Sequence, residues 1–109
     1  MALAEDEIAR LRSQHGIVAL VSFNASEFAP ALDVAVKMPP RGEYKRYRAE
    51  LFDDAMRPNA LETLARACIV YPDKAAIDEA LICRPALFER VGNRLTEMLG
   101  DEGTSAKKH

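Results

Sequence analysis

The fold is decided by the stretch Ala31-Leu-Asp-Val-Ala-Val-Lys-Met-Pro-Pro-Arg-Gly-Glu-Tyr-Lys-Arg-Tyr-Arg48, in which a strand ends and a helix begins. Over residues 31–38, large apolar residues alternate with small or charged ones, which is the period-two pattern of a half-buried strand. Pro39-Pro40 then opens a helix, because a proline in the first helical turn removes only an N–H that would be unpaired there. We therefore expect a helix over residues 40–56.

The residues before this stretch predict a second strand and a short helix. Residues 17–23, Ile-Val-Ala-Leu-Val-Ser-Phe, are rich in β-branched side chains, and Asn24-Ala-Ser-Glu27 separates them from the strand at 31–38. The two strands should form a β-hairpin, which needs helices on one face to be stable. Residues 2–15 carry an apolar stripe and acids at their start, so they predict a helix that Gly16 ends.

The residues after the stretch predict three more helices. Pro58-Asn59 starts one, Tyr71-Pro72-Asp73 ends it and caps a helix over 73–84, and Pro85 opens the last helix, which runs to Gly100. The expected inward residues are Leu61, Leu64, Ala65, Cys68, Ile69, Ile77, Leu81, Leu87, Phe88, Val91, Leu95 and Leu99. The class is α+β and mostly helical: an N-terminal helix, a β-hairpin and four short packed helices. We expect one globular domain over 1–100 and a flexible tail over 101–109.

Composition excludes several classes of protein. The chain has 109 residues, of which 49% are hydrophobic, so it has enough apolar surface to fold without a metal or disulfide. Its formal charge of −2 excludes a histone-type nucleic-acid binder. Acids occupy the start where a signal peptide would carry lysines, and the aliphatic run Ile17–Val21 is far too short to span a membrane. We therefore expect a cytoplasmic protein with no membrane partner.

The two cysteines, Cys68 and Cys83, predict reduced core thiols. Both fall on the apolar faces of expected helices, although a secreted protein could pair them. Cys68 is flanked by apolar residues, and a desolvated thiol has a raised pKa and low reactivity.

Residues able to support catalysis are scarce. His15 and His109 are the only histidines, and neither has a partner at metal-binding spacing. The five glycines form no phosphate-binding loop. We therefore expect no catalytic residue, no cofactor and no metal, and hence no enzyme. A deep pocket that joined His15 to Cys68 would change this interpretation.

The most informative surface lies on the expected helix 40–56. Residues 41–48 carry four bases and one acid, whereas residues 49–54 carry three acids and no base, which opposes the preference of the helix dipole. Arg41, Lys45 and Arg48 should share a face beside Tyr44 and Tyr47. Tyrosine beside arginine is typical of protein interfaces, so these residues are the candidate protein-binding site. Two alternatives remain open: a solvated face stabilised by Glu43–Arg46 and Arg46–Glu50 pairs, and a nucleic-acid surface.

Over residues 17–98 the order of landmarks resembles the small tail assembly chaperones of long-tailed bacteriophages and prophages. A strand ends at a P-x-R-x-E-Y-like helix start, here Pro39-Pro-Arg-Gly-Glu-Tyr44, and a Tyr-Pro turn after a cysteine precedes a P-x-L helix. The matching positions are Pro39, Arg41, Glu43, Tyr44, Tyr47, Cys68, Tyr71, Pro72, Pro85 and Leu87. One departure is Gly42, a poor helix former.

The resemblance implies a non-enzymatic protein, encoded among tail genes and acting inside a bacterial or phage-infected cell. Such chaperones are thought to bind the tape measure protein and keep it soluble until the tail tube assembles around it. The implied partner is therefore the tape measure protein or another tail component, and no catalytic residue is carried over. The alternative is a bacterial protein of the same fold with a regulatory or nucleic-acid-associated role, acting through the basic stripe of helix 40–56.

Overall fold

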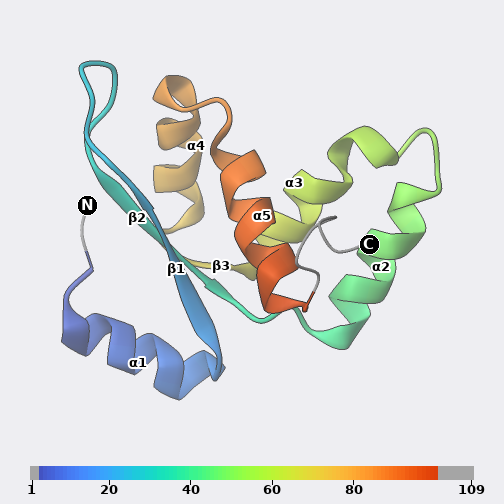
Figure 1. The fold of residues 1–109 in the computed structure, drawn as a ribbon, viewed down its shortest axis with the longest axis horizontal. Helices are drawn as coiled ribbons and strands as arrows, with labels where there is room; N and C mark the ends of the chain where they lie inside the picture. Colours follow the sequence, from blue (N-terminus) through green and yellow to red (C-terminus); the bar gives the residue numbers. More distant parts are fainter. Residues whose placement is uncertain (1–2, 101–109) are drawn as a thin grey trace, which may run out of the picture.

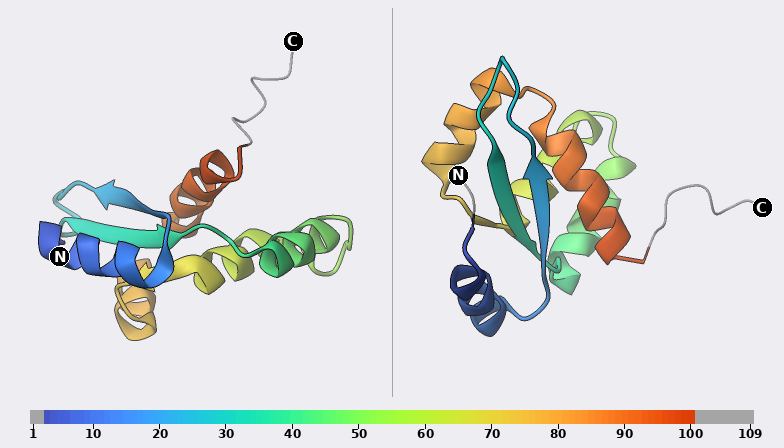
Figure 2. Two further views of the ribbon diagram at one scale, coloured as in Figure 1. Left: turned by 90° about the horizontal axis from the view of Figure 1, so that it is seen from below. Right: turned by 60° about the vertical axis from the view of Figure 1, so that its left-hand side comes forward.

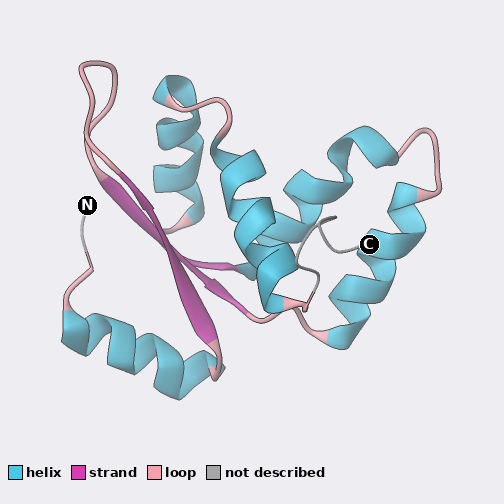
Figure 3. Ribbon diagram, viewed as in Figure 1, coloured by secondary structure: helices cyan, strands magenta, loops and turns pink. Residues whose placement is uncertain are grey.

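The computed structural model describes residues 3–100, which form five helices around an antiparallel sheet of three strands (Figures 1 and 3). The elements in chain order are α1 (Glu5–His15), β1 (Val18–Phe23), β2 (Leu32–Lys37), α2 (Arg41–Leu51), α3 (Arg57–Cys68), β3 (Ile69–Tyr71), α4 (Lys74–Cys83) and α5 (Leu87–Met98). The expected class and the order of helix, hairpin and helices are confirmed. The expected tail, 101–109, lies outside the described residues.

The sheet has the order β1-β2-β3, so β2 is its central strand. β1 and β2 pair in the expected hairpin, with Val18 opposite Lys37 and Phe23 opposite Leu32. β3 was not predicted, because Ile69 was expected to extend the apolar stripe of a helix. The helix instead ends at Cys68, and the β-branched Ile69 and Val70 fit an extended strand beside β2 better than a helix.

The main core lies where α3 and α5 pack against the sheet. Its fully buried members include Val34 and Val36 of β2, Leu64 of α3, and Val91 and Leu95 of α5. These residues lie at the spacings that the sequence predicted. Residues expected inward that remain only partly buried are Leu61, Ile69, Leu81 and Leu99.

The other face of β2 is also covered, which the sequence pattern did not predict. Ala35 is fully buried in a second cluster with Leu11 of α1 and Val18 of β1. Strand β2 is therefore covered on its second face at Ala35, where α1 packs, while Asp33 and Lys37 on that face stay half-buried (Figure 2). Asp33 ties this side together, since its carboxylate accepts hydrogen bonds from the Leu3 N–H at 3.0 Å and the Ser22 hydroxyl at 2.9 Å.

The local signals at helix ends act largely as expected. Gly16 follows α1 with φ of 82°, a conformation that favours glycine, and the Asp73 carboxylate accepts a hydrogen bond from the Ala76 N–H at 2.9 Å at the start of α4. The exception is the predicted helix 40–56, which ends at Leu51. Residues 52–56 form turns in which the Asp53 side chain accepts a hydrogen bond from the Ala55 N–H at 2.9 Å. Within residues 3–100, no helix is both long enough and apolar enough to cross a membrane.

Gly92 permits close packing between α5 and α3. A Cβ added at Gly92 would lie 2.7 Å from the Leu61 Cγ, so Gly92→Ala should lower the free energy of unfolding by about 1 kcal/mol once its gain in helix propensity is subtracted. Gly42→Ala is the matched control: nothing lies within 4 Å of its added Cβ, so it should raise stability by about 0.5–1 kcal/mol. Urea denaturation of both variants tests this, and a stabilising Gly92→Ala would contradict the packing.

Candidate protein-binding surface

Helix α2 lies at the opposite end of the molecule from α1 (Figures 1 and 2). It has 11 residues and none of them is buried, whereas each of the other helices has at least one buried residue. α2 packs beside α3, and Tyr47 is partly buried against the main core. Five residues of α2 are exposed and available to another molecule, and the other six are half-buried; the exposed ones are Arg41, Gly42, Lys45, Arg48 and Ala49.

The two tyrosines predicted for the site lie together as expected. Tyr44 and Tyr47 line a hollow of about 250 Å³ between α2 and the end of α5. Its other lining residues are Arg48, Leu51, Thr96 and Leu99. The Arg48 guanidinium carbon lies 6.0 Å from the centre of the Tyr44 ring, at the edge of cation–π range. The hollow offers apolar rings and aliphatic groups beside a guanidinium, and it is smaller than the roughly 300–1,000 Å³ of typical small-molecule sites.

The three predicted basic side chains, Arg41, Lys45 and Arg48, are exposed. Their spacing of four and three residues places them on one face of α2. No acidic side chain within residues 3–100 forms an ion pair with any of the three. We call them the basic stripe.

The ion pairs that the sequence predicts for a solvated face, Glu43–Arg46 and Arg46–Glu50, are also present. Arg46 forms ion pairs with Glu43 and with Glu50, the latter at 3.8 Å. Several of the charged atoms in these pairs are buried, and the contacts lack hydrogen-bond geometry. These pairs neutralise Arg46, but they do not involve the basic stripe.

The acidic block was expected on the same helix as the bases, and the structure corrects this. Because α2 ends at Leu51, Asp53 and Asp54 lie in the turn that precedes α3. The Asp53 carbonyl accepts a hydrogen bond from the Arg57 N–H at 2.8 Å, and the Asp54 carboxylate pairs with the Arg57 side chain. Acidic side chains just before a helix interact favourably with the positive end of its dipole. Asp53 and Asp54 therefore suit the start of α3.

The turn between α2 and α3 exposes two large apolar side chains that the sequence pattern did not identify. Phe52 is 81% exposed and Met56 is 45% exposed. Phe52 lies just beyond the end of α2, outside the periodic stripe of Tyr44, Tyr47 and Leu51, so helical spacing could not reveal it. Exposed aromatic and methionine side chains beside arginine are typical of protein interfaces. We call the whole candidate surface the α2 surface. It comprises the basic stripe, Tyr44, Tyr47, Phe52 and Met56.

A second apolar groove lies at the other end of the fold, between the β1–β2 loop and α4. It has a volume of about 310 Å³, and the loop is held beside α4 by Arg84, which donates hydrogen bonds to the carbonyls of Asn24 and Pro30 at 2.8 Å each. Phe28 and Ile82, next in sequence to lining residues, are 77% and 78% exposed. This groove carries no stripe of unpaired charge that would indicate the chemistry of a partner.

The cysteines differ from each other, which corrects the prediction that both are core thiols. Cys68 is fully buried and burial raises the pKa of its thiol to about 11. Cys83 is exposed, because it lies six residues after the buried Ile77 and hence about 120° away from it around α4. Both thiols are free.

This difference predicts selective reaction with a thiol reagent. At about pH 8, native protein should react rapidly at Cys83 alone, because Cys68 stays protonated and shielded until the chain unfolds. An Ellman assay with and without denaturant measures both populations. Cys83→Ser is the control and should leave no rapidly reacting thiol, whereas rapid reaction in native Cys83→Ser would contradict the burial of Cys68.

The structure does not join the groups that a catalytic interpretation needs. His15 is exposed at the end of α1, and none of the four hollows of 240–310 Å³ described in residues 3–100 is lined by His15 or Cys68. The same part of the chain contains no group of three His, Cys, Asp or Glu residues able to hold a metal ion.

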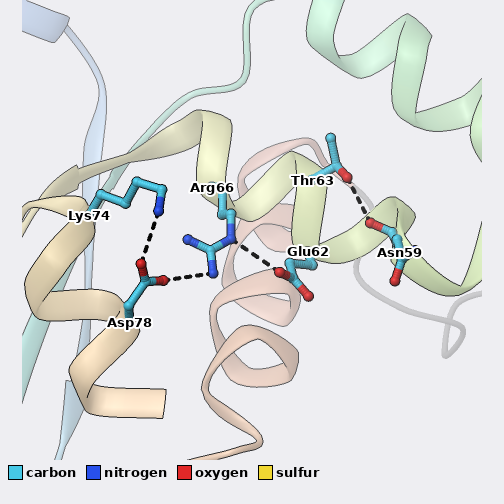
Figure 4. A network of polar contacts seen from close by, with 6 residues as sticks. All are labelled: Asn59, Glu62, Thr63, Arg66, Lys74 and Asp78. Carbon is cyan, nitrogen blue, oxygen red and sulfur yellow. Dashed lines mark hydrogen bonds and ion pairs between the residues drawn. The ribbon is translucent and has the colours of Figure 1, made fainter. Parts of the chain in front are cut away.

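The main polar network joins α3 to α4. Arg66 of α3 donates to Asp78 of α4 at 2.9 Å and to Glu62 at 3.1 Å, while Lys74 donates to the other Asp78 oxygen at 3.0 Å (Figure 4). The bonds from Lys74 and Arg66 lower the pKa of Asp78, and the bond to Asp78 raises that of Arg66. Arg66 also stacks on Phe88, with 4.9 Å to the ring centre. Arg66 and Asp78 each have two hydrogen-bond partners, which fits a structural link between α3 and α4.

The fold and the α2 surface together define a small α+β domain with an exposed helical surface of basic, aromatic and apolar side chains. The chain belongs to the family described as a domain of unknown function, DUF6848, whose model matches residues 11–108. The solved structure of the uncharacterised protein rbstp2171 from Bacillus stearothermophilus is similar, with a TM-score of 0.70 and 20% identity over 93% of this chain and 99% of that one. That likeness shows the fold. No curated protein matches the chain.

Proposed function

We propose that this chain is a non-enzymatic protein-binding module, a tail assembly chaperone that acts in the cytoplasm and keeps a tape measure protein soluble before tail assembly. The observation that carries the proposal is α2, a helix with no buried residue whose last residue, Leu51, is followed by the exposed Phe52. A helix whose apolar side chains are left half-covered gains stability when a partner covers them. The order of landmarks over residues 17–98, which resembles that of tail assembly chaperones, supports the choice of partner.

The mechanism follows from the arrangement of the surface. Tyr44, Tyr47 and Phe52 offer aromatic area at low entropic cost, and the basic stripe beside them remains available for acidic groups. A long partner helix with an exposed apolar face aggregates through that face. Covering the face on α2 would prevent this, and the release of the chaperone would then expose it to the tail tube subunits.

Co-expression tests the proposal. The chain should increase the soluble fraction of a tape measure protein encoded beside it and should co-purify with it. The variant Phe52→Ser removes an exposed apolar group of the α2 surface without touching the core clusters, so it should increase the soluble fraction less than the unmodified chain does. The proposal fails if the tape measure protein stays equally insoluble with and without the chain.

The alternative, a regulatory or nucleic-acid-associated domain, uses the basic stripe alone. It predicts duplex binding that weakens steeply with salt and does not need Phe52. A gel-shift titration at low and moderate salt distinguishes it from the chaperone.

A further inference from the structure

We infer that the α2 surface recognises an acidic amphipathic helix, in which the partner's carboxylates meet Arg41, Lys45 and Arg48 and its apolar face covers the hollow at Tyr44 and Tyr47. This inference rests on the proposed function and names the chemistry of the partner at the same site.

The spacing of the basic stripe fits a helix. Arg41, Lys45 and Arg48 follow each other at four and three residues, so they rise about 10 Å along α2 on one face. Acidic residues at the same spacings on a partner helix would face all three cations at once. No acid of the described chain already occupies these cations, so the partner need not displace an internal ion pair.

The apolar half of the surface requires the partner to be amphipathic. The hollow of about 250 Å³ beside the basic stripe is lined mainly by Tyr44, Tyr47, Leu51 and Leu99, with Arg48 at the boundary between the two halves. Partner residues spaced like Glu-x-x-Leu could place a carboxylate on Arg48 and an apolar side chain in the hollow. A highly acidic but wholly polar peptide would leave the hollow uncovered.

The local charges favour an acidic helix over a nucleic acid. The basic stripe has three cations, fewer than the roughly six to ten phosphate contacts of a duplex binder whose affinity falls steeply with salt. Asp53 and Asp54 lie in the turn just beyond the end of α2, so a phosphate backbone that ran past the basic stripe would meet their carboxylates there. On a partner helix, acids spaced at four and three residues need face only the three cations.

Two synthetic peptides test the inference on the full chain. Both have about 18 residues, or five helical turns, and the same leucine stripe, but one carries glutamates and the other lysines on its polar face. Fluorescence anisotropy at low salt should show the glutamate peptide binding at least about tenfold more tightly than the lysine peptide. The variant R41E/R48E should lose most of this preference. The matched control R10E/R12E makes the same charge change on exposed residues of α1 and should retain it within about twofold.

The outcomes separate this inference from the proposed function. Equal binding of the two peptides, no binding of either, or an unchanged preference in R41E/R48E would overturn the acidic-helix inference. Tighter binding of a duplex DNA probe than of the glutamate peptide would overturn it in favour of nucleic acid. If the tape measure protein is still kept soluble in any of these cases, the chaperone function stands and only the partner chemistry is wrong.

Discussion

Leu64→Ala should lower the free energy of unfolding by about 3 kcal/mol, a large part of the total for a domain of this size. Leu64 lies on α3, is fully buried, and belongs to the core that joins α3 and α5 to the sheet. Its truncation would leave a cavity that the fully buried Val34 and Val91, members of the same core, cannot readily fill. Urea denaturation followed by circular dichroism measures the change.

Leu51→Ala is the matched control for Leu64→Ala. Leu51 ends α2, is half-buried and belongs to neither core cluster, so the same chemical change should cost less than about 1 kcal/mol. Equal losses for the two variants would contradict the assignment of the core to α3 and the exposed role of α2.

The double variant Tyr44→Ala/Phe52→Ala should weaken binding to the tape measure partner by at least about 100-fold, because aromatic anchors at an interface each contribute about 2 kcal/mol or more. Neither residue belongs to a core cluster, so the variant should remain folded, with a change in unfolding free energy below about 1 kcal/mol. Titration calorimetry with the co-purified partner segment measures the affinity.

Phe28→Ala is the matched control for this second prediction. Phe28 is 77% exposed, close to the 81% of Phe52, but it belongs to the β1–β2 loop, and this loop lies at the other end of the molecule from α2 (Figure 1). Its replacement should change the affinity by less than about twofold if binding uses α2. A larger loss from Phe28→Ala than from the double variant would move the interface to the groove between this loop and α4.

The parts of the fold that local chemistry determines could be predicted from sequence. The alternation over residues 31–38, the prolines before α2 and in the first turn of α3, and Asp73 before α4 all act locally, and the structure has the expected elements at each. β3 could not be predicted, because three residues carry no period, and its strand conformation depends on pairing with β2. The burial of Ala35 likewise depends on α1 packing across the sheet.

In the candidate site, too, some features could be predicted from the sequence and others could not. Helical spacing correctly placed Tyr44 beside Tyr47 and the basic stripe on one face. It extended the helix too far, because the acids at 53 and 54 fit a helix as well as a turn, and so it assigned the charge pattern to one element. Phe52 was missed for the same reason: its exposure follows from the position at which α2 ends.

The most direct test of the central claim is hydrogen exchange of the chain, alone and in complex with the co-expressed tape measure protein. If α2 is the binding surface, the amides of residues 41–52 should become markedly more protected in the complex, while those of α1 and the β1–β2 loop should not change. Protection confined to the β1–β2 loop and α4, with α2 unchanged, would contradict the claim.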